Sequence, residues 1–303
     1  MRGFLTYIIC ALSLVLLAPI DADIASGAPA AKKLGILILA RGVDPPEVPV
    51  SEWDQHVIDA VEPIKKEYDV ELVLGLEPEK LQEGIDKLQS RYNDKILVIP
   101  MYISTHSPLV RKMEYYLGIE PVPPERVDDI KPVNVKADIH MAHATEHDAL
   151  IAEVVYDRTM EISRNPANET VILVAHGPTT RESETLWLKS MYALASYIRE
   201  RGGFKDATVG TIMFGAPKEV MKQANENLRK LVDEKGRDSD VLVVPCLMAP
   251  GGIEDMIADV MKGQTFRYGR PYLPHVNITR WLKATIDAKL ALWGRESKVP
   301  YPY

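Results

Sequence analysis

Residues 171–178, VILVAHGP, decide the fold of this chain. The apolar run has the length of a strand that is buried on both faces, and it ends at His176 and Gly177. Residues 37–42, LILARG, repeat the pattern with Arg41 in place of the histidine. Continuous apolar strands that alternate with amphipathic helices are typical of a parallel sheet covered on both sides. We therefore expect an α/β fold.

The alternation continues along both halves of the chain. A second pair of runs, ILVIP at 96–100 and VLVVP at 241–245, is 145 residues apart, close to the offset of 135 residues for the first pair. Such long offsets indicate a duplicated domain, because solenoid repeats are much shorter. The predicted architecture is two tandem domains, each a mainly parallel four-stranded sheet flanked by helices, with a cleft between the lobes. The expected parts are a signal peptide at 1–28, a first domain at 33–145 whose closing helix 148–164 packs across the lobes, a second domain at 168–294 and a tail at 295–303.

The expected strands and helices follow from the period of the apolar residues. In the first half we expect strands at 34–40, 70–76, 95–103 and 133–139, and helices at 52–68, 79–92, 108–117 and 148–163. In the second half we expect strands at 170–175, 207–213, 240–248 and 266–273, and helices at 182–201, 218–234, 253–261 and 278–293.

Composition and charge exclude several classes of protein. The chain has 303 residues, a net charge of -7 and 46% hydrophobic residues, which is ordinary for a globular protein and unlike a disordered one. The acidic balance argues against nucleic-acid binding, which needs a basic face. The two cysteines, Cys10 and Cys246, provide no disulfide framework.

Residues 1–28 have the pattern of a secretory signal. Arg2 precedes an apolar run from Phe4 to Ile20, and small residues follow at 25–28. The run is short for a membrane span. We expect cleavage, an exported periplasmic or extracellular protein, and no stable membrane span afterwards; an uncleaved anchor is the alternative.

Six of the seven histidines follow predicted strands, at the sheet edge where open α/β sheets bind ligands. Imidazole is a common metal ligand and titrates near neutral pH. The alternative is that each histidine caps a helix or bonds a loop carbonyl. The six are His106, His140, His143, His147, His176 and His275.

His140, His143 and His147 form a separate candidate metal site. On a helix, His143 and His147 would share one face, with Glu146 beside them. The segment HATEH is not the HExxH pattern of zinc proteases. The alternative is that His147 lies at the N-cap of the following helix and faces solvent.

Two further features could bind an anion. Pro250, Gly251 and Gly252 precede a helix and could direct backbone N–H groups toward an anion, although they lack the lysine and spacing of a phosphate loop. Arg41 could pair with substrate carboxylates, or form a salt bridge between the domains.

The segments AHGP at 175–178 and ISTHS at 103–107, together with the duplicated plan, resemble the sirohydrochlorin cobalt/iron chelatases of the CbiX type, in the class II chelatase superfamily. The resemblance covers residues 34–293 as two tandem copies. It implies ATP-independent insertion of a divalent metal into a tetrapyrrole. The family's two metal-handling histidines follow the first and third strands of a domain. His176 and His106 match these positions, whereas Arg41 and Gly251 stand at the other two.

The resemblance implies one composite site in which His106 and His176 hold the metal or accept protons from the pyrrole nitrogens. The metal is expected to be Co²⁺, with Fe²⁺ and Ni²⁺ as alternatives, and the partner is a tetrapyrrole such as sirohydrochlorin; a homo-oligomer stays open. The alternative function is a non-catalytic carrier of haem, another tetrapyrrole or metal outside the cytoplasm. Residues expected to bind the tetrapyrrole or relay protons are Arg41, Gly177, Gly251, Glu184 and Glu254.

Overall fold

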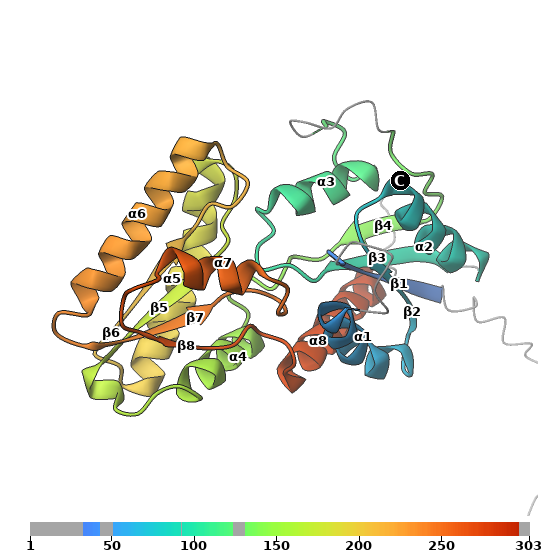
Figure 1. The fold of residues 1–303 in the computed structure, drawn as a ribbon. Helices are drawn as coiled ribbons and strands as arrows, with labels where there is room; N and C mark the ends of the chain where they lie inside the picture. Colours follow the sequence, from blue (N-terminus) through green and yellow to red (C-terminus); the bar gives the residue numbers. More distant parts are fainter. Residues whose placement is uncertain (1–32, 43–50, 92, 124–130, 297–303) are drawn as a thin grey trace, which may run out of the picture. The chain divides into compact units, whose positions relative to one another are not determined.

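The computed structural model describes residues 33–42, 51–91, 93–123 and 131–296, drawn as ribbons in Figure 1. They belong to one compact unit, Lys32–Tyr303. The expected signal peptide at 1–28 and most of the tail lie outside the described residues. Among the residues that are described, no helix is long and apolar enough to cross a membrane.

Strands and helices alternate in both halves, as the apolar pattern predicts. The strands are β1 (Lys33–Ala40), β2 (Asp69–Leu74), β3 (Asn93–Pro100), β4 (Asp138–Met141), β5 (Glu169–Ala175), β6 (Asp206–Thr211), β7 (Asp240–Pro245) and β8 (Arg267–Tyr268). The helices are α1 (Glu52–Lys65), α2 (Pro78–Ser90), α3 (Pro108–Tyr116), α4 (Ala149–Met160), α5 (Arg181–Gly202), α6 (Lys218–Lys235), α7 (Ile253–Val260) and α8 (Val276–Glu296), with a short 3-10 turn at Pro166–Asn168.

The strands form two parallel four-stranded sheets with the same order, β2-β1-β3-β4 and β6-β5-β7-β8. In the first sheet Ile36 pairs with Val70 and Leu97, and in the second Ile172 pairs with Thr208 and Val243. The α/β fold class and the duplication are confirmed. Because all neighbours are parallel, the carboxyl ends of the strands in each sheet lie at one edge.

The fourth strand of the first sheet begins later than the expected residue 133. The backbone N–H of Asn134 donates to the Gln82 side chain, and those of Lys136 and Ala137 donate to the Gln89 side chain. Side chains of α2 therefore take hydrogen bonds that a strand would need.

The fourth strand of the second sheet is shorter than expected because it ends at Tyr268 instead of Leu273. Two prolines, Pro271 and Pro274, lie in the segment that follows, and a proline has no N–H to donate to a ladder.

Each sheet buries both faces under helices. In the first sheet Ile36 and Ile38 point into a cluster that includes α1 and α8, whereas Leu37 and Leu39 point toward α2 and α3. This alternation is the period of a β-strand. The second sheet repeats it, with α4 and α5 on one face and α6 and α7 on the other.

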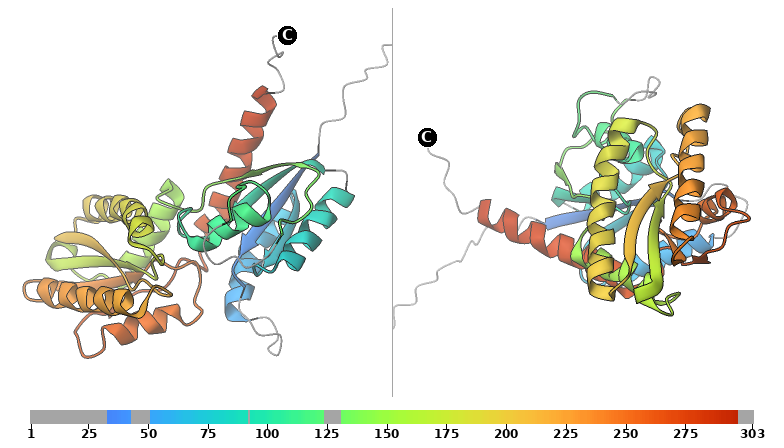
Figure 2. Two further views of the ribbon diagram at one scale, coloured as in Figure 1. Left: turned by 90° about the horizontal axis from the view of Figure 1, so that it is seen from above. Right: turned by 90° about the vertical axis from the view of Figure 1, so that its left-hand side faces the viewer.

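The last helix of each half is exchanged. Helix α8, which the sequence division placed with residues 168–294, packs against α1 and β3 of the first half (Figures 1 and 2). Thr279 of α8 donates to the carbonyl of Ala60. Helix α4 packs against α5 and β7 of the second half instead.

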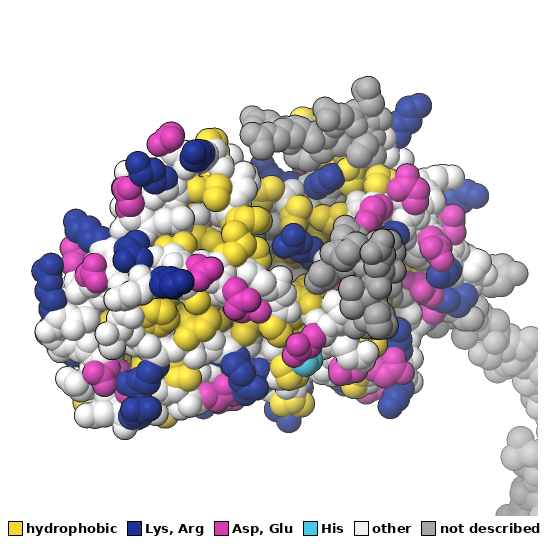
Figure 3. Space-filling model, viewed as in Figure 1, with side chains coloured by type: hydrophobic (Ala, Val, Ile, Leu, Met, Phe, Trp, Pro, Cys, Tyr) yellow, Lys and Arg dark blue, Asp and Glu magenta, His cyan; other side chains and the backbone are white. Residues whose placement is uncertain are grey.

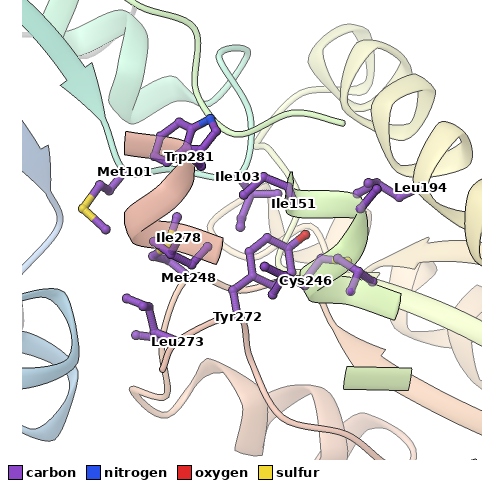
Figure 4. Close-up of a cluster of buried hydrophobic side chains, with 14 of the residues drawn as sticks. Met101, Ile103, Ile151, Leu194, Cys246, Met248, Tyr272, Leu273, Ile278 and Trp281 are labelled. Atoms are coloured by element: carbon purple, nitrogen blue, oxygen red, sulfur yellow. The ribbon is translucent and has the colours of Figure 1, made fainter. Parts of the chain in front are cut away.

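The two halves share one hydrophobic core. Figure 4 shows Met101 and Ile103, which follow β3, beside Cys246 and Met248 from the end of β7 and Trp281 of α8. All five side chains belong to one buried cluster. This cluster fixes the strand ends of both sheets near one another, and the candidate site lies on it.

Candidate functional site

A cavity of about 730 Å³ lies at the carboxyl ends of the strands and is lined by both halves. Its size is ordinary for a small-molecule site, and strand carboxyl ends are where open α/β sheets bind ligands. Figure 3 shows hydrophobic side chains gathered in the hollow of this face, with positively charged side chains beside them. The expected cleft between the two halves is thus present as a cavity with a largely apolar wall.

His176 follows β5 directly and lines the cavity. Its Nδ1 lies 2.6 Å from the carbonyl oxygen of Gly177, which can only accept, so Nδ1 carries the proton and Nε2 keeps its lone pair. Burial, together with a smaller effect of the charge of Arg41, lowers the pKa of His176 to about 4. At neutral pH the ring is a neutral imidazole that is suited to bind a metal and is a weak proton acceptor.

Gly177 allows the tight turn after His176. Its φ is +75°, and a Cβ there would lie 2.9 Å from Cβ of Thr211. Met213 has a φ of 46°, which is rare for a non-glycine residue. The amide of Phe214 donates to the carbonyl of His176 at 2.8 Å. The turn and the end of β6 thus hold the histidine in place, and Gly177 serves geometry as well as lining the cavity.

Arg41 occupies the equivalent position in the first half and also lines the cavity. Gly42 repeats the turn with a φ of +68°, and a Cβ on it would lie 2.9 Å from the nitrogen of Gly75. The exposed guanidinium forms no ion pair with any described residue. The predicted salt bridge between the domains is therefore not formed in that part of the chain, and Arg41 is left able to bind an anion.

The backbone N–H groups before α7 are already used. Glu254 accepts from the amide of Gly251 at 2.9 and 3.0 Å and from that of Gly252 at 3.1 Å. Gly251 and Glu254 both line the cavity, but the predicted anion site at this helix start is filled by the chain's own carboxylate. Gly251 lies against Trp53, where a Cβ would come within 2.9 Å of the indole.

Glu184 does not line the cavity. Its carboxylate accepts from the hydroxyl of Thr211 at 2.6 Å and from Arg181 at 2.7 Å. Because Thr211 lies against Gly177, Glu184 supports the turn that carries His176 instead of facing a ligand.

His106 lies in the loop before α3, where its amide lies 3.2 Å from the hydroxyl of Ser104. It is absent from the cavity lining, although Ser107 and Tyr102 on either side are part of it. The charges of His143 and His106 act on the half-buried Glu114, whose pKa is raised by burial. The composite pair of His106 and His176 stays a prediction.

The structure does not gather His140, His143 and His147 on a helix. His140 lies within β4 and packs edge-on against Trp293, with ring centroids 5.0 Å apart. The helix begins only at Ala149, and Asp148 is its N-cap, so the predicted helical spacing of His143 and His147 and the N-cap role of His147 are wrong. Across residues 33–42, 51–91, 93–123 and 131–296, no three His, Cys, Asp or Glu side chains are placed to hold a metal ion.

His275 also has a structural partner. Its Nε2 lies 3.1 Å from Asp157 of α4, and its Nδ1 accepts from the amide of Asn277 at the start of α8. Cys246 is buried, and burial raises the pKa of its thiol to about 12, so the thiol stays protonated at neutral pH.

Sequence reasoning missed several residues of the cavity wall. Tyr102 is 8% exposed and Tyr116 is fully buried, yet neither hydroxyl has a hydrogen-bond partner among the described residues. Lys112 places its ammonium group 5.3 Å from the ring centroid of Tyr116. Glu77 has one buried carboxylate oxygen without a partner in the same part of the chain. A sequence signal for Tyr102, Lys112 and Tyr116 was available, because polar and aromatic residues stand directly after β3 and on α3.

Comparisons with known proteins agree with this geometry at the level of the fold. No family model matches the chain, and no curated protein matches its sequence. SirB from Bacillus subtilis, solved with Fe³⁺, has a TM-score of 0.61 at 15% identity over 89% of this chain and 100% of its own. CbiX, the terminal enzyme of siroheme biosynthesis in denitrifying bacteria, has a TM-score of 0.56 at 12% identity over 84% of this chain and 98% of its own.

A third solved structure is a multidomain protein from Deinococcus radiodurans with structural similarity to chelatases. It has a TM-score of 0.53 at 16% identity over 84% of this chain and 55% of that one. At these identities the likeness establishes a chelatase-type fold.

Proposed function

We propose that this protein is a chelatase that inserts a divalent metal ion into a tetrapyrrole within the cavity. One observation carries the proposal: a neutral, half-buried imidazole, His176, lines a largely apolar cavity at the strand ends of a chelatase-type fold. A flat macrocycle needs an apolar wall, and an incoming metal substrate needs a ligand that it can leave again. Together these features support binding of a tetrapyrrole with its centre toward His176.

Metal insertion releases two protons from the pyrrole nitrogens for each metal ion that enters. His176 is unsuited to take them, because a base with a pKa of about 4 stays unprotonated at neutral pH. The carboxylates of Glu77 and Glu254 line the same cavity. Glu77 offers a buried oxygen with no partner among the described residues. We assign the metal to Nε2 of His176. The two protons pass to solvent water with Glu77 as a relay, because the pKa of Glu77 lies below its ordinary value and its carboxylate does not keep a proton at neutral pH.

The metal and the compartment belong to the proposal. Imidazole accepts cobalt, iron and nickel alike, so all three ions are tested as substrates. The proposal also includes export directed by residues 1–28. Its test is fractionation of the source cells, with mass spectrometry of the N-terminus of the recovered protein.

The experiment mixes purified protein with sirohydrochlorin and Co²⁺, Fe²⁺ or Ni²⁺ and follows the absorbance of the product. The expected result is a rate above the spontaneous reaction that falls at least tenfold in His176→Ala. His147→Ala is the matched control, because His147 is exposed and outside the cavity lining. No acceleration with any of the three metals would contradict the enzymatic proposal.

A second candidate function is a tetrapyrrole carrier, and it is favoured by the absence of His106 from the cavity lining. A carrier needs one metal ligand and no proton acceptor. It predicts stable binding of haem without acceleration of metal insertion, and a Soret band that shifts in His176→Ala. His106→Ala tests the composite site of His106 and His176. If both histidines hold the metal, His106→Ala loses as much metal insertion as His176→Ala. Neither a chelatase that uses His176 alone nor a carrier predicts that loss.

A further inference from the structure

Tyr102 places a hydrogen-bond donor in the cavity wall with no acceptor in the described part of the chain. The side chain is 8% exposed, and its hydroxyl makes no hydrogen bond there. An unpaired buried hydroxyl costs about 1–3 kcal/mol, so such groups usually face a ligand or an ordered water. Tyr102 lines the cavity directly. Its hydroxyl is therefore available to an acceptor on a bound molecule.

A cation accompanies this hydroxyl. The charge of Arg41 acts on Tyr102 and on His176, so the three groups lie close enough to interact. Burial raises the pKa of Tyr102, which keeps the phenol protonated and able to donate. A guanidinium and a phenol are both donors. An acceptor that also carries negative charge satisfies both of them.

The same pairing occurs a second time on α3. Tyr116 is fully buried and its hydroxyl has no partner within the described ranges. The ammonium group of Lys112 lies 5.3 Å from its ring centroid, and Lys112 forms no ion pair with a described residue. Both residues line the cavity. The first half therefore presents two donor pairs in the cavity wall: Lys112 beside the ring of Tyr116, and Arg41 with Tyr102 in the same lining.

We propose that these pairs are specificity subsites for two carboxylate substituents of the tetrapyrrole, one held by Arg41 and Tyr102 and the other by Lys112 and Tyr116. This inference rests on the proposed function and adds the orientation of the ligand. The carboxylates face the first half, and the centre of the macrocycle faces His176 of the second half.

Carboxylate is the ligand chemistry that fits this wall best. It has about four acceptor positions, enough for a phenol and a cation together. The wall also contains a negative charge, the carboxylate of Glu77, but Lys80 pairs with it at 3.2 Å and neutralises it. A ligand without carboxylates would leave the two buried hydroxyls without an acceptor. The cavity is thus expected to discriminate by the number of carboxylates.

The test measures binding of two metal-free porphyrins to the full chain by quenching of tryptophan fluorescence. Uroporphyrin carries eight carboxylates, and mesoporphyrin, used here as its dimethyl ester, carries none. Wild type is expected to bind uroporphyrin more tightly. The double variant Tyr102→Phe/Tyr116→Phe is expected to bind uroporphyrin at least tenfold more weakly, with less than threefold change for mesoporphyrin. Tyr115→Phe is the matched control, because this neighbour does not line the cavity.

A second variant keeps the test decisive if the double variant is unstable. Arg41 is exposed, so Arg41→Gln should fold normally, and it is expected to weaken uroporphyrin by the same order without changing mesoporphyrin. Unchanged uroporphyrin affinity in both variants would overturn the subsites and leave the proposed function standing. Failure of wild type to bind either porphyrin would overturn the proposed function and the subsites with it.

Discussion

The imidazole of His176 packs edge-on against the indole of Trp187, with ring centroids 5.0 Å apart and planes at 80°. Trp187 is 1% exposed and belongs to α5, the helix that follows the turn after His176. The turn, its helix and the ring thus form one packed unit. Trp187 does not line the cavity, so it contacts the imidazole on the side away from the cavity. Burial of the ring in this unit is the main cause of the low pKa of His176.

The first prediction concerns pH. Burial lowers the pKa of His176 from its ordinary value of 6.5 to about 4. Between these values the unfolded chain binds a proton at this residue and the folded chain does not, so stability is present above pH 6.5 and is lost as pH falls toward 4. The difference is about 3–4 kcal/mol at most, because each pKa unit corresponds to about 1.4 kcal/mol. Urea unfolding of wild type and His176→Asn across this range measures it.

The expected outcome is a smaller loss of stability in His176→Asn than in wild type over that window. His147→Asn is the control and should follow the wild-type curve, since His147 is exposed. Parallel curves for all three proteins would show that His176 is protonated normally in the folded protein.

The second prediction concerns Arg158, a buried residue of α4. Its guanidinium donates to the carbonyls of Pro271 and Tyr272, each at 2.8 Å, and to that of Pro274. These residues lead into α8. Arg158→Met leaves the three carbonyls without partners, and we expect a loss of about 3–5 kcal/mol.

The midpoint of urea unfolding checks this loss. Arg199→Met is the matched control, because Arg199 is an exposed arginine on α5 whose nearest carboxylate, Glu200, is 3.8 Å away. It should change stability by less than about 0.5 kcal/mol. An equal effect of the two substitutions would mean that Arg158 is not the link to the segment before α8.

The third prediction concerns Glu146, whose φ of 44° is rare outside glycine. Its carboxylate accepts from the amide of Thr105 and, at 2.7 Å, from the hydroxyl of Ser190. It thereby joins the loop after β3 to α5 of the second half. We expect Glu146→Gln to lower stability by about 1–2 kcal/mol. A hydrogen bond to a charged group is worth about 1.5–3 kcal/mol, and the amide oxygen of glutamine can still accept one neutral hydrogen bond, so only part of that energy is lost.

Thermal unfolding measures this effect, with Glu226→Gln on α6 as the control. The nearest cation to Glu226 is Lys222 at 4.0 Å, in an exposed pair of negligible strength. If Glu146→Gln matches that control, the carboxylate does not join the two halves.

The apolar runs predicted the two sheets because their burial on both faces leaves a local signal in residues such as 171–175 and 241–245. The helix at 148–164 is expected to pack across the lobes, and α4 does contact the second half. The placement of α8 on the first half has no such signal, since an amphipathic helix does not reveal which sheet it covers. His106 and Tyr102 show the same limit at the site. Both residues follow β3, but only Tyr102 lines the cavity. The path of this loop decides that difference, and the hydrogen bond from Thr105 to Glu146 helps to set the path. The candidate metal site of His143 and His147 required both residues on a helix, but the helix begins after them because Asp148 is its N-cap.

The last prediction separates backbone strain from crowding at the turn that carries His176. Gly177 and Gly203 have similar values of φ, +75° and +66°, but only Gly177 is crowded: its Cβ would meet Thr211 at 2.9 Å, whereas nothing lies within 4 Å of the other. We expect Gly203→Ala to cost about 1 kcal/mol from strain alone. Gly177→Ala should cost at least twice as much and should also weaken the proposed binding of a metal ion to His176, because the turn must shift. Urea unfolding with a parallel Co²⁺ titration measures both effects. Equal losses of stability would show that Thr211 gives way, and unchanged metal binding in Gly177→Ala would show that the turn does not set the position of His176.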